Sequence, residues 1–369
     1  MAARPVTRRS IAAPTAPVRP RPAVRDFSGG SAGFHIEWDI RPVYDFVFSI
    51  TADDSWTHDI AAEDQALVAA GRERLRAEAA PEAVSIVEDE CGIHVASVAV
   101  ERPEIRTAVQ LVDAIETASL PDLYRSIVSD VTRHPSSMVL VDRAIAGDAK
   151  AIDELRDAAE YDWKVGPLRL LEDPEGSRQH IVQVLRIWLD LYRPIEDRIT
   201  AILDRDYALR AGDRATLEPV ELIERTTGGV RWLPEAGVKR VVLAPSYFTR
   251  PYNFLLAGET WRYFGYPVAD DALEVSDPLA APQNVVRLHR ALGDETRLRI
   301  LKLLSAKDLY LTEIAQQLDL SKPTIKHHLA LLRAAGLVTI TEAGTVIYYS
   351  LRPSGLDEAS TDLKRFLLG

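Results

Sequence analysis

A stretch near the C-terminus, SKPTIKHHLALLRAAGLVTI, combines cationic and short polar side chains with a regular apolar repeat. Ile325, Leu329 and Leu332 recur at positions i, i+4 and i+7, so they share one face of a predicted helix and point to a core. Ser321 can cap this helix, and Pro323 is tolerated in the first turn because that position has no intrahelical hydrogen bond to lose. The polar and cationic side chains are therefore left on the face that solvent reaches.

That opposite face holds Lys322, Lys326 and Arg333, flanked by Thr324 and His327. A helix with a free and positively biased N-terminus suits the major groove of double-stranded DNA, where base edges and phosphates are both within reach. A solvated helix face on a protein-binding scaffold is the plain alternative. We favour DNA binding because the cations gather at the helix end that reads grooves.

The neighbouring segments predict the elements that position this helix. NVVRLHRALGDETRLRILKLL predicts two helices that meet near Gly293, and LTEIAQQLDL predicts a third, for which Thr312 is a suitable N-cap. A turn of a few residues joins this third helix to the cationic one, and Ala315 supplies the small residue needed where the two cross. GLVTITEAGTVIYYSL then predicts two strands that form a hairpin around Ala343 and Gly344.

This order of elements closely resembles the winged helix-turn-helix of the ArsR/SmtB-type bacterial repressors. The resemblance rests on ALGDETRLRILKLL, on LTEIAQQLDLSKPTIKHHLALLRAAGLV and on the YYSL that closes the hairpin. It implies a DNA-binding transcriptional regulator, a repressor, whose homodimer matches a palindromic operator. It also implies that Arg297 and His328 hold phosphate or structure. The residues that it places at DNA-reading positions are Ser321, Lys322, Thr324, Lys326 and His327.

Two features depart from that family's pattern. The tip of the hairpin reads TEAGT, without the Arg or Lys that would enter a minor groove, so we expect no such contact from it. Metal-sensing members place Cys in the helix before the turn, whereas this chain has KDLYLTEIA there, and its last helix, DEASTDLKRFLL, contains no His. Because borderline and soft metals need Cys or His ligands, we expect no metal and no other cofactor.

Formal charge is divided unevenly along the chain. The net charge is -11 at pH 7, from 44 Lys and Arg against 55 Asp and Glu. Residues 284–369 hold 12 Lys and Arg against 9 Asp and Glu, a net of +3, which leaves 32 against 46, or -14, for residues 1–283. The segment before Asp26 contains six arginines and no acid. Such an asymmetry permits one basic surface on an acidic whole.

Composition also bears on where the protein works. No apolar run approaches the roughly 18 residues of a membrane span, and the N-terminus continues into IAAPTAPVRPRPAV instead of a signal segment. We therefore expect a cytoplasmic protein without a membrane partner. Cys91 is the one cysteine, so no internal disulfide can form. It has no neighbouring cation to lower its pKa, and we expect a buried, inert thiol.

The pattern along the rest of the chain predicts an α+β domain ahead of the winged helix. FHIEWDI, VKRVVLAPSYF, YNFLLAG and WRYFGYPV have the character of strands, and PEAVSIVEDECGIHVASVAV is ambiguous. A long helical repeat follows Glu175 and is interrupted at Pro194, where we expect a kink or two helices. The predicted organisation is a flexible basic arm (1–30), an N-terminal α+β sensor and dimerisation domain (31–270), a linker (271–283) and a winged helix-turn-helix domain (284–369).

The role of the acidic domain stays open between three alternatives. Its many aromatic residues either line a pocket for a small-molecule effector or fill the core. The first alternative is therefore a sensor of a small-molecule effector. The second is an enzyme of unknown reaction with a regulatory winged helix, and the third is a structural protein-interaction module. Two motifs, TADDSWTHD and HIEWD, could hold a metal or act in acid–base chemistry, but we favour ordinary loop carboxylates because no known catalytic motif accompanies them. The residues concerned are Asp53, Asp54, His58, Asp59, His35 and Glu37.

Overall fold

A computed structural model of the chain describes residues 33–52, 59–88, 91–130, 135–158, 162–273, 281–343 and 346–368. The residues from Phe34 onward form one unit. The expected basic arm (1–30) lies outside the described residues. So do residues 274–280 of the expected linker, the hairpin tip at 344–345 and residues 53–58 of TADDSWTHD.

A four-stranded sheet stands in the middle of the N-terminal part, with the strand order β1-β3-β5-β4. β1 pairs with β3 and β3 with β5 in parallel, whereas β4 and β5 are antiparallel. All four segments that the sequence predicted as strands are confirmed. Their bounds are His35–Trp38 (β1), Arg240–Ser246 (β3), Phe254–Ala257 (β4) and Trp261–Pro267 (β5).

The two faces of this sheet are buried against different partners. Along β3, Val242 and Ala244 join the large core of the N-terminal helices, whereas Val241 and Leu243 join a second cluster on the opposite face. The alternation follows from the two-residue period of a strand. A strand buried on both faces reads as an unbroken apolar run, which explains why VVLA in β3 carries no polar residue.

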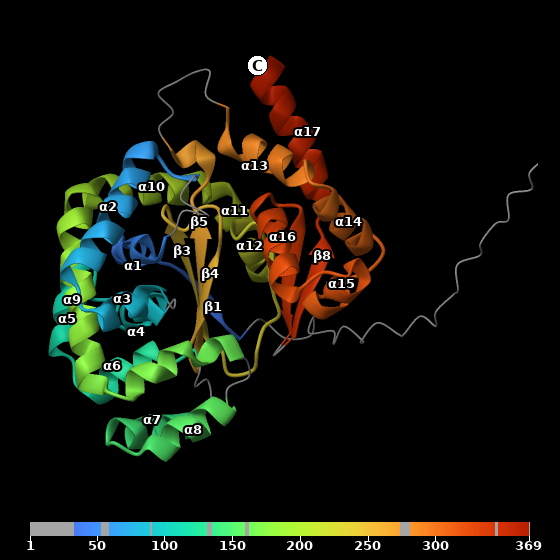
Figure 1. Cartoon of the computed structure of the whole chain (residues 1–369). Coiled ribbons are helices and arrows are strands. Elements are labelled where there is room, and N and C mark those ends of the chain that lie inside the picture. Colours follow the sequence, from blue (N-terminus) through green and yellow to red (C-terminus); the bar gives the residue numbers. More distant parts are fainter. Residues whose placement is uncertain are drawn as a thin grey trace, which may run out of the picture. The chain divides into compact units, whose positions relative to one another are not determined.

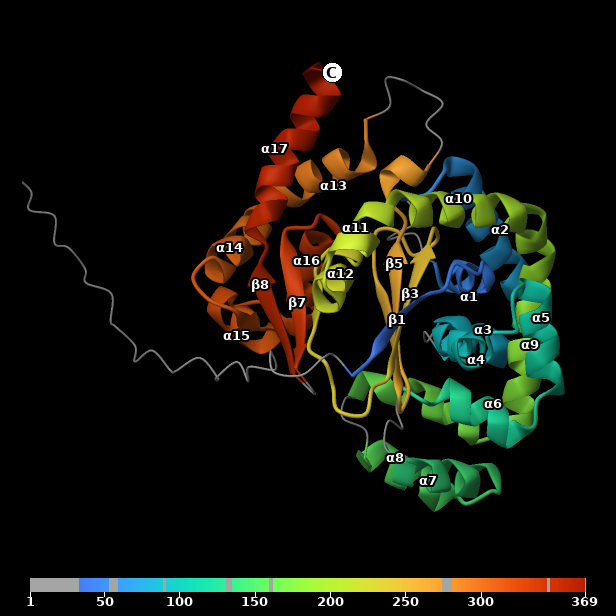
Figure 2. The same cartoon turned by 180° about the vertical axis from the view of Figure 1, so that it is seen from behind.

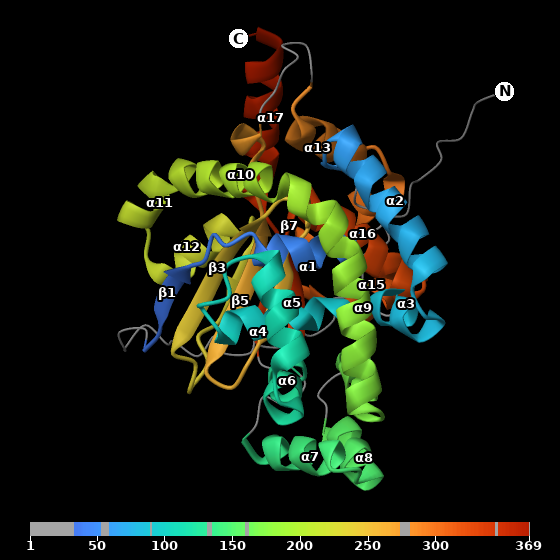
Figure 3. The ribbon, with the colours of Figure 1, turned by 90° about the vertical axis from the view of Figure 1, so that its left-hand side faces the viewer.

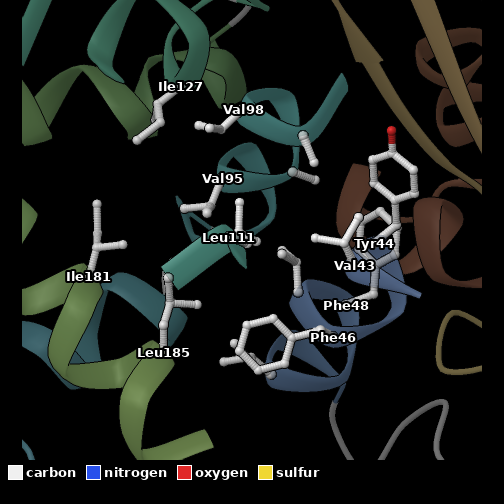
Figure 4. Close-up of a cluster of buried hydrophobic side chains, with 14 of the residues drawn as sticks. Val43, Tyr44, Phe46, Phe48, Val95, Val98, Leu111, Ile127, Ile181 and Leu185 are labelled. Carbon is white, nitrogen blue, oxygen red and sulfur yellow. The ribbon is translucent and has the colours of Figure 1, made fainter. Parts of the chain in front are cut away.

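Helices α1 to α9 lie on one side of the sheet (Figure 1). Their core gathers residues from α1, α4, α5, α6 and α9, with Phe46, Leu111 and Leu185 pointing towards a common interior (Figure 4). The segment that was ambiguous in the sequence, residues 81–100, is helical where it is described. The bounds are Val43–Thr51 (α1), Ala62–Glu78 (α2), Pro81–Glu88 (α3), Ala96–Glu101 (α4), Ala108–Thr117 (α5), Leu120–Ile127 (α6), Pro135–Ile145 (α7) and Ala149–Ala158 (α8).

The long helical repeat is divided at Pro194, as predicted. α9 (Pro174–Tyr192) ends in a short 3-10 turn (Arg193–Ile195), and α10 (Glu196–Leu209) continues in a new direction (Figure 3). Proline removes a hydrogen bond and its ring displaces the preceding turn, so one straight helix cannot continue there. Two more helices follow, α11 (Ala211–Thr216) and α12 (Pro219–Thr226).

The C-terminal part has the element order of a winged helix-turn-helix. Its bounds are Gln283–Leu292 (α13), Glu295–Leu304 (α14), Leu309–Tyr310 (β6), Leu311–Leu318 (α15), Lys322–Ala334 (α16), Val338–Ala343 (β7), Val346–Leu351 (β8) and Pro353–Leu368 (α17). One local prediction was wrong, because Thr312 is not the N-cap of α15. The cap is Tyr310, whose backbone N–H donates to Glu313 Oε2 at 3.0 Å.

A short strand of the N-terminal part extends the wing sheet. β2 (Val230–Trp232) pairs in parallel with β7, so the second sheet has the order β2-β7-β8-β6. Gly229 precedes β2 at a φ of 122°, and its carbonyl accepts a hydrogen bond from the Ile340 N–H at 3.0 Å. The wing residue Ile340 shares a buried cluster with Ile223 of α12 and with Val241 and Leu243 of the first sheet. Figure 2 shows α12 between that sheet and the wing strands. The sequence did not predict this strand or this shared core.

The N-terminal part thus mixes helices and strands around a largely parallel sheet. Within the residues that the structure describes, no helix has the length and apolar character required to cross a membrane.

Candidate nucleic-acid interface

The turn between α15 and α16 sets the position of the cationic helix. α15 ends at Asp319, whose φ of 55° lies in the left-handed region, and the Leu320 N–H then donates to the Ala315 carbonyl at 3.1 Å. Ser321 caps α16, because its Oγ accepts from the Thr324 N–H at 3.3 Å. The Ser321 and Thr324 hydroxyls are also 2.7 Å apart. The N-terminus of α16 is therefore closed by two short polar side chains that stay at the surface.

The apolar stripe of α16 faces the core, as predicted. Ile325, Leu329 and Leu332 are no more than 1% exposed and pack in the cluster formed by α13, α14 and α15. Within the described part of the chain, the ammonium groups of Lys322 and Lys326 have neither a hydrogen bond nor an ion pair, so they are available to a partner. The exposed side chains at this end of the helix are Ser321, Lys322, Thr324, Lys326 and His327.

Arg297 holds structure in this conformation. Its Nε donates to the Ala291 carbonyl at 2.7 Å and its Nη2 donates to the Arg290 carbonyl at 2.7 Å. Both carbonyls belong to the last turn of α13, where the regular helical donors run out. The Arg290 carbonyl also accepts from the Gly293 N–H at 3.3 Å. Arg297 therefore joins the end of α13 to the start of α14.

His328 is half-buried beside the cap of α14. Burial lowers the pKa of its imidazole, although the Asp294 carboxylate, 3.8 Å from His328 Nδ1, opposes this effect. Asp294 caps α14 by accepting from the Arg297 N–H at 2.9 Å, and this bond lowers the pKa of Asp294. The neutral imidazole is thus favoured, which makes His328 a weaker phosphate ligand than the two exposed lysines.

Arg333 differs from the position that helical spacing predicted for it. The spacing put it on the solvent side with Lys322 and Lys326, but its side chain is half-buried near the C-terminal end of α16. There its charge acts on Tyr349 of β8 and opposes the rise in the pKa of Tyr349 that burial causes. Arg333 is therefore less open to solvent than the two lysines at the start of the helix.

The wing is braced at both edges. Ile340 of β7 lies opposite Tyr349 of β8, and β2 covers the outer edge of β7. On the other edge, the hydroxyls of Tyr310 and Tyr348 are 2.7 Å apart, and this hydrogen bond raises the pKa of Tyr310 to about 12. The sequence signal for β2 was weak, since a three-residue strand after Gly228-Gly229 is too short for a periodicity argument.

Two of the carboxylates that the sequence offered as metal ligands, Glu37 and Asp59, have other partners in the structure. His35 is exposed at the start of β1, and Glu37 pairs with Arg240 at 3.3 Å. Asp59 is buried and pairs with Arg250 and Arg287. Asp53, Asp54 and His58 lie outside the described residues. Within the described ranges, no three His, Cys, Asp or Glu side chains are grouped so that they could hold a metal ion.

Comparisons with known proteins concern this same region. A family model described as "Bacterial regulatory protein, arsR family" matches residues 294–339. The transcriptional repressor SdpR of Bacillus subtilis (strain 168) is 36% identical over 78 residues, which are 21% of this chain and 87% of that protein. The HTH-type transcriptional regulator Rv2034 of Mycobacterium tuberculosis (strain ATCC 25618 / H37Rv) is 41% identical over 80 residues, 22% of this chain and 75% of that protein.

Among solved structures, HlyU from Vibrio cholerae N16961 is 30% identical to this chain, covering 24% of this chain and 95% of that one. Its TM-score is 0.19, so it carries no argument about the fold.

Proposed function

Because this chain belongs to the ArsR family of bacterial regulatory proteins, we propose that it is a transcriptional repressor that reads operator DNA with α16. The observation that carries the proposal is the exposed N-terminal end of that helix. Lys322 and Lys326 stand there with no partner among the described residues, beside the hydroxyl of Thr324. Cationic and short polar groups at the start of a helix match the base edges and phosphates of a major groove.

In this proposal Arg297, His328 and Arg333 have supporting roles. The first two hold the junction of α13 and α14, and the charge of the third acts on Tyr349 of the wing. Contact with phosphate through their remaining donors is secondary. In this proposal β7 and β8 of the wing contact the DNA backbone without a cation at their tip.

The N-terminal part, taken as an α+β domain, modulates operator affinity in this proposal. The supporting contacts are direct ones, since β2 pairs with the wing strand β7 and Arg287 of α13 pairs with Asp59. A signal received in the N-terminal part can reach α13 and the wing through them. The chain acts as a regulator with a small-molecule effector and not as an enzyme, and it works in the cytoplasm, where bacterial DNA is found.

The active species of the proposal is a homodimer. Palindromic operators match the two-fold symmetry of such an assembly. On α17, Leu356, Leu367 and Leu368 are 42%, 65% and 82% exposed. Exposed leucines on a terminal helix are suited to a partner copy.

The test is a binding titration of the full chain with DNA from the region upstream of its own gene. Replacing Lys322, Thr324 and Lys326 together by Ala should weaken specific binding by about 1–3 kcal/mol for each good base contact that is lost. The melting temperature should stay unchanged because these side chains are exposed. Leu329→Ala should instead lower the melting temperature, since it opens a cavity behind the same helix.

A charge-matched control removes two lysines from elsewhere in the winged helix. Lys302→Ala combined with Lys307→Ala deletes the same two charges at exposed positions outside α16. This double variant should keep most of the discrimination between the upstream fragment and unrelated DNA. Equal discrimination by the control and the α16 variant would refute the role of α16.

A further inference from the structure

A hollow of about 70 Å³ lies where three parts of the chain meet. α13 contributes Arg290 and Ala291 to its lining, and the C-terminal end of α16 contributes Leu331 and Ala334. Tyr252, from the turn that follows β3, closes it from the N-terminal part. A molecule bound here would touch the recognition helix, the first helix of the winged domain and the N-terminal part at once.

Arg287 lines the hollow but supplies no excess charge to it. Its guanidinium pairs with Asp59 and lies 3.8 Å from Asp270 Oδ1, while Arg250 pairs with the same two carboxylates. Two arginines are thus balanced by two aspartates. Arg287 Nε is nevertheless buried without a hydrogen-bond acceptor among the described residues.

The excess positive charge comes from Arg290 and Arg297. The Arg290 guanidinium has no hydrogen-bond or ion-pair partner among the described side chains. Arg297 commits two of the five donors of a guanidinium to the carbonyls of α13, which leaves the others free to bind an anion. The carboxylate of Asp294 interacts with Arg297 through its charge. Two guanidinium groups against one carboxylate favour an anionic ligand.

The rest of the lining is apolar. Ala291, Leu331 and Ala334 present methyl and methylene groups, and Tyr252 presents a ring. An inorganic anion would have to lose part of its hydration shell to lie against these apolar groups, which is unfavourable. An organic acid would instead cover them with its carbon chain. We take each non-hydrogen atom of a ligand to need about the 10–15 Å³ that one water-sized probe occupies. The hollow then has room for about five such atoms.

We propose that this hollow binds a small organic carboxylate, of about the size of propionate, between the guanidinium groups of Arg290 and Arg297 and the apolar end of α16. That the bound acid acts as the effector rests on the proposed function. Because it would touch α13, α16 and Tyr252 together, its binding favours one arrangement of these elements over another.

The first test uses the full chain without DNA. Calorimetric titration with sodium propionate, against a sodium chloride baseline of equal ionic strength, should show saturable binding. Propionamide, which has the same shape without the charge, should bind at least about tenfold more weakly, and so should inorganic phosphate. Absence of propionate binding, equal binding of propionamide, or preferential binding of phosphate would each overturn the proposal.

Arg290→Gln then locates the site. Arg290 is exposed, so the variant should fold, and its affinity for propionate should fall about tenfold or more. Arg299→Gln is the matched control, because it removes one exposed arginine from α14 outside the hollow. Wild-type affinity in Arg290→Gln, or the same loss in both variants, would show that propionate binds elsewhere.

A DNA titration separates the two proposals. Operator binding measured without propionate tests the proposed function alone. If both hold, propionate should change operator affinity by about 5- to 150-fold, and operator DNA should change propionate affinity by the same factor. Propionate binding without any effect on operator affinity would leave a ligand site but overturn its role as the effector site.

Discussion

Arg287 of α13 and Asp59, 228 residues apart in the sequence, form an ion pair in which the carboxylate is completely buried. Arg250, 1% exposed, lies 3.6 Å from the same carboxylate. Next to this group, the Asn284 N–H donates to Asp270 Oδ2 at 2.7 Å. Burial of these charges is tolerated only because each has a partner of opposite sign. The first helix of the winged domain is therefore held on the N-terminal part by these charged and polar contacts.

Loss of this pair should be costly. Arg287→Met keeps the length of the side chain but leaves Asp59 with Arg250 as its remaining cation, so the free energy of unfolding should fall by about 3 kcal/mol. Arg365→Met is the control, since the Arg365 side chain is 72% exposed in its pair with Asp362 and should change stability by no more than about 0.5 kcal/mol. Urea denaturation of both variants measures the difference, and similar small losses would mean that the buried pair contributes little.

Gly229 should be required for β2 to lie against the wing. Its φ of 122° disfavours any side chain, and a Cβ there would approach Thr339 Cγ2 at 3.0 Å. Gly237 has a φ of 92°, but a Cβ on it would meet nothing within 4 Å. Gly229→Ala should therefore destabilise the fold more than Gly237→Ala, whose cost of roughly 1–3 kcal/mol reflects the backbone alone. Hydrogen exchange at the Ile340 amide, which donates to the Gly229 carbonyl, should increase in the first variant only.

Asp45 should make stability depend on pH in an unusual direction. Its carboxylate, on α1, is fully buried next to the residues that follow β3. There it accepts from the Tyr247 and Phe248 N–H groups at 2.9 and 3.0 Å. Burial, the largest effect, raises the pKa of Asp45 to about 6 from 3.8, although these hydrogen bonds oppose the rise. Because the folded state binds the proton more tightly, this contribution is complete below about pH 4 and is lost as the pH rises through about 6.

The loss amounts to about 3 kcal/mol, since each pKa unit corresponds to 1.36 kcal/mol. Asp45→Asn cannot titrate, so it should lack this component of the pH profile. The measurement is the free energy of unfolding of both proteins between about pH 4 and pH 7, taken as a difference so that other carboxylates cancel. Parallel profiles for the two proteins would contradict the assignment.

Zinc should have no effect on operator binding. The positions where metal-sensing relatives carry Cys or His lie in KDLYLTEIA and DEASTDLKRFLL, which supply neither residue. Operator affinity should therefore be the same with stoichiometric zinc and with a chelator. A reproducible shift would indicate that side chains of TADDSWTHD or HIEWD form a metal site after all.

The sequence alone predicted the helices of the winged domain and the buried face of α16, because the information for them is local. The i, i+4, i+7 spacing of Ile325, Leu329 and Leu332 determines which face of α16 is buried, and hence which side chains are exposed at its start. Ser321 could be recognised as a cap from its position before Lys322-Pro323. The break at Pro194 was equally readable, since proline acts on its own turn.

The tertiary structure alone decided how the two parts of the chain meet. Three features depend on residues that are distant in sequence or on different elements. They are the pairing of β2 with β7, the ion pair of Asp59 with Arg287, and the half-burial of Arg333. A three-residue strand is too short to show a hydrophobic period in the sequence. An aspartate is also written the same way in the sequence whether its carboxylate is buried or exposed to solvent. Such contacts depend on which surfaces become neighbours during folding, and the spacing of residues within one segment carries no information about that.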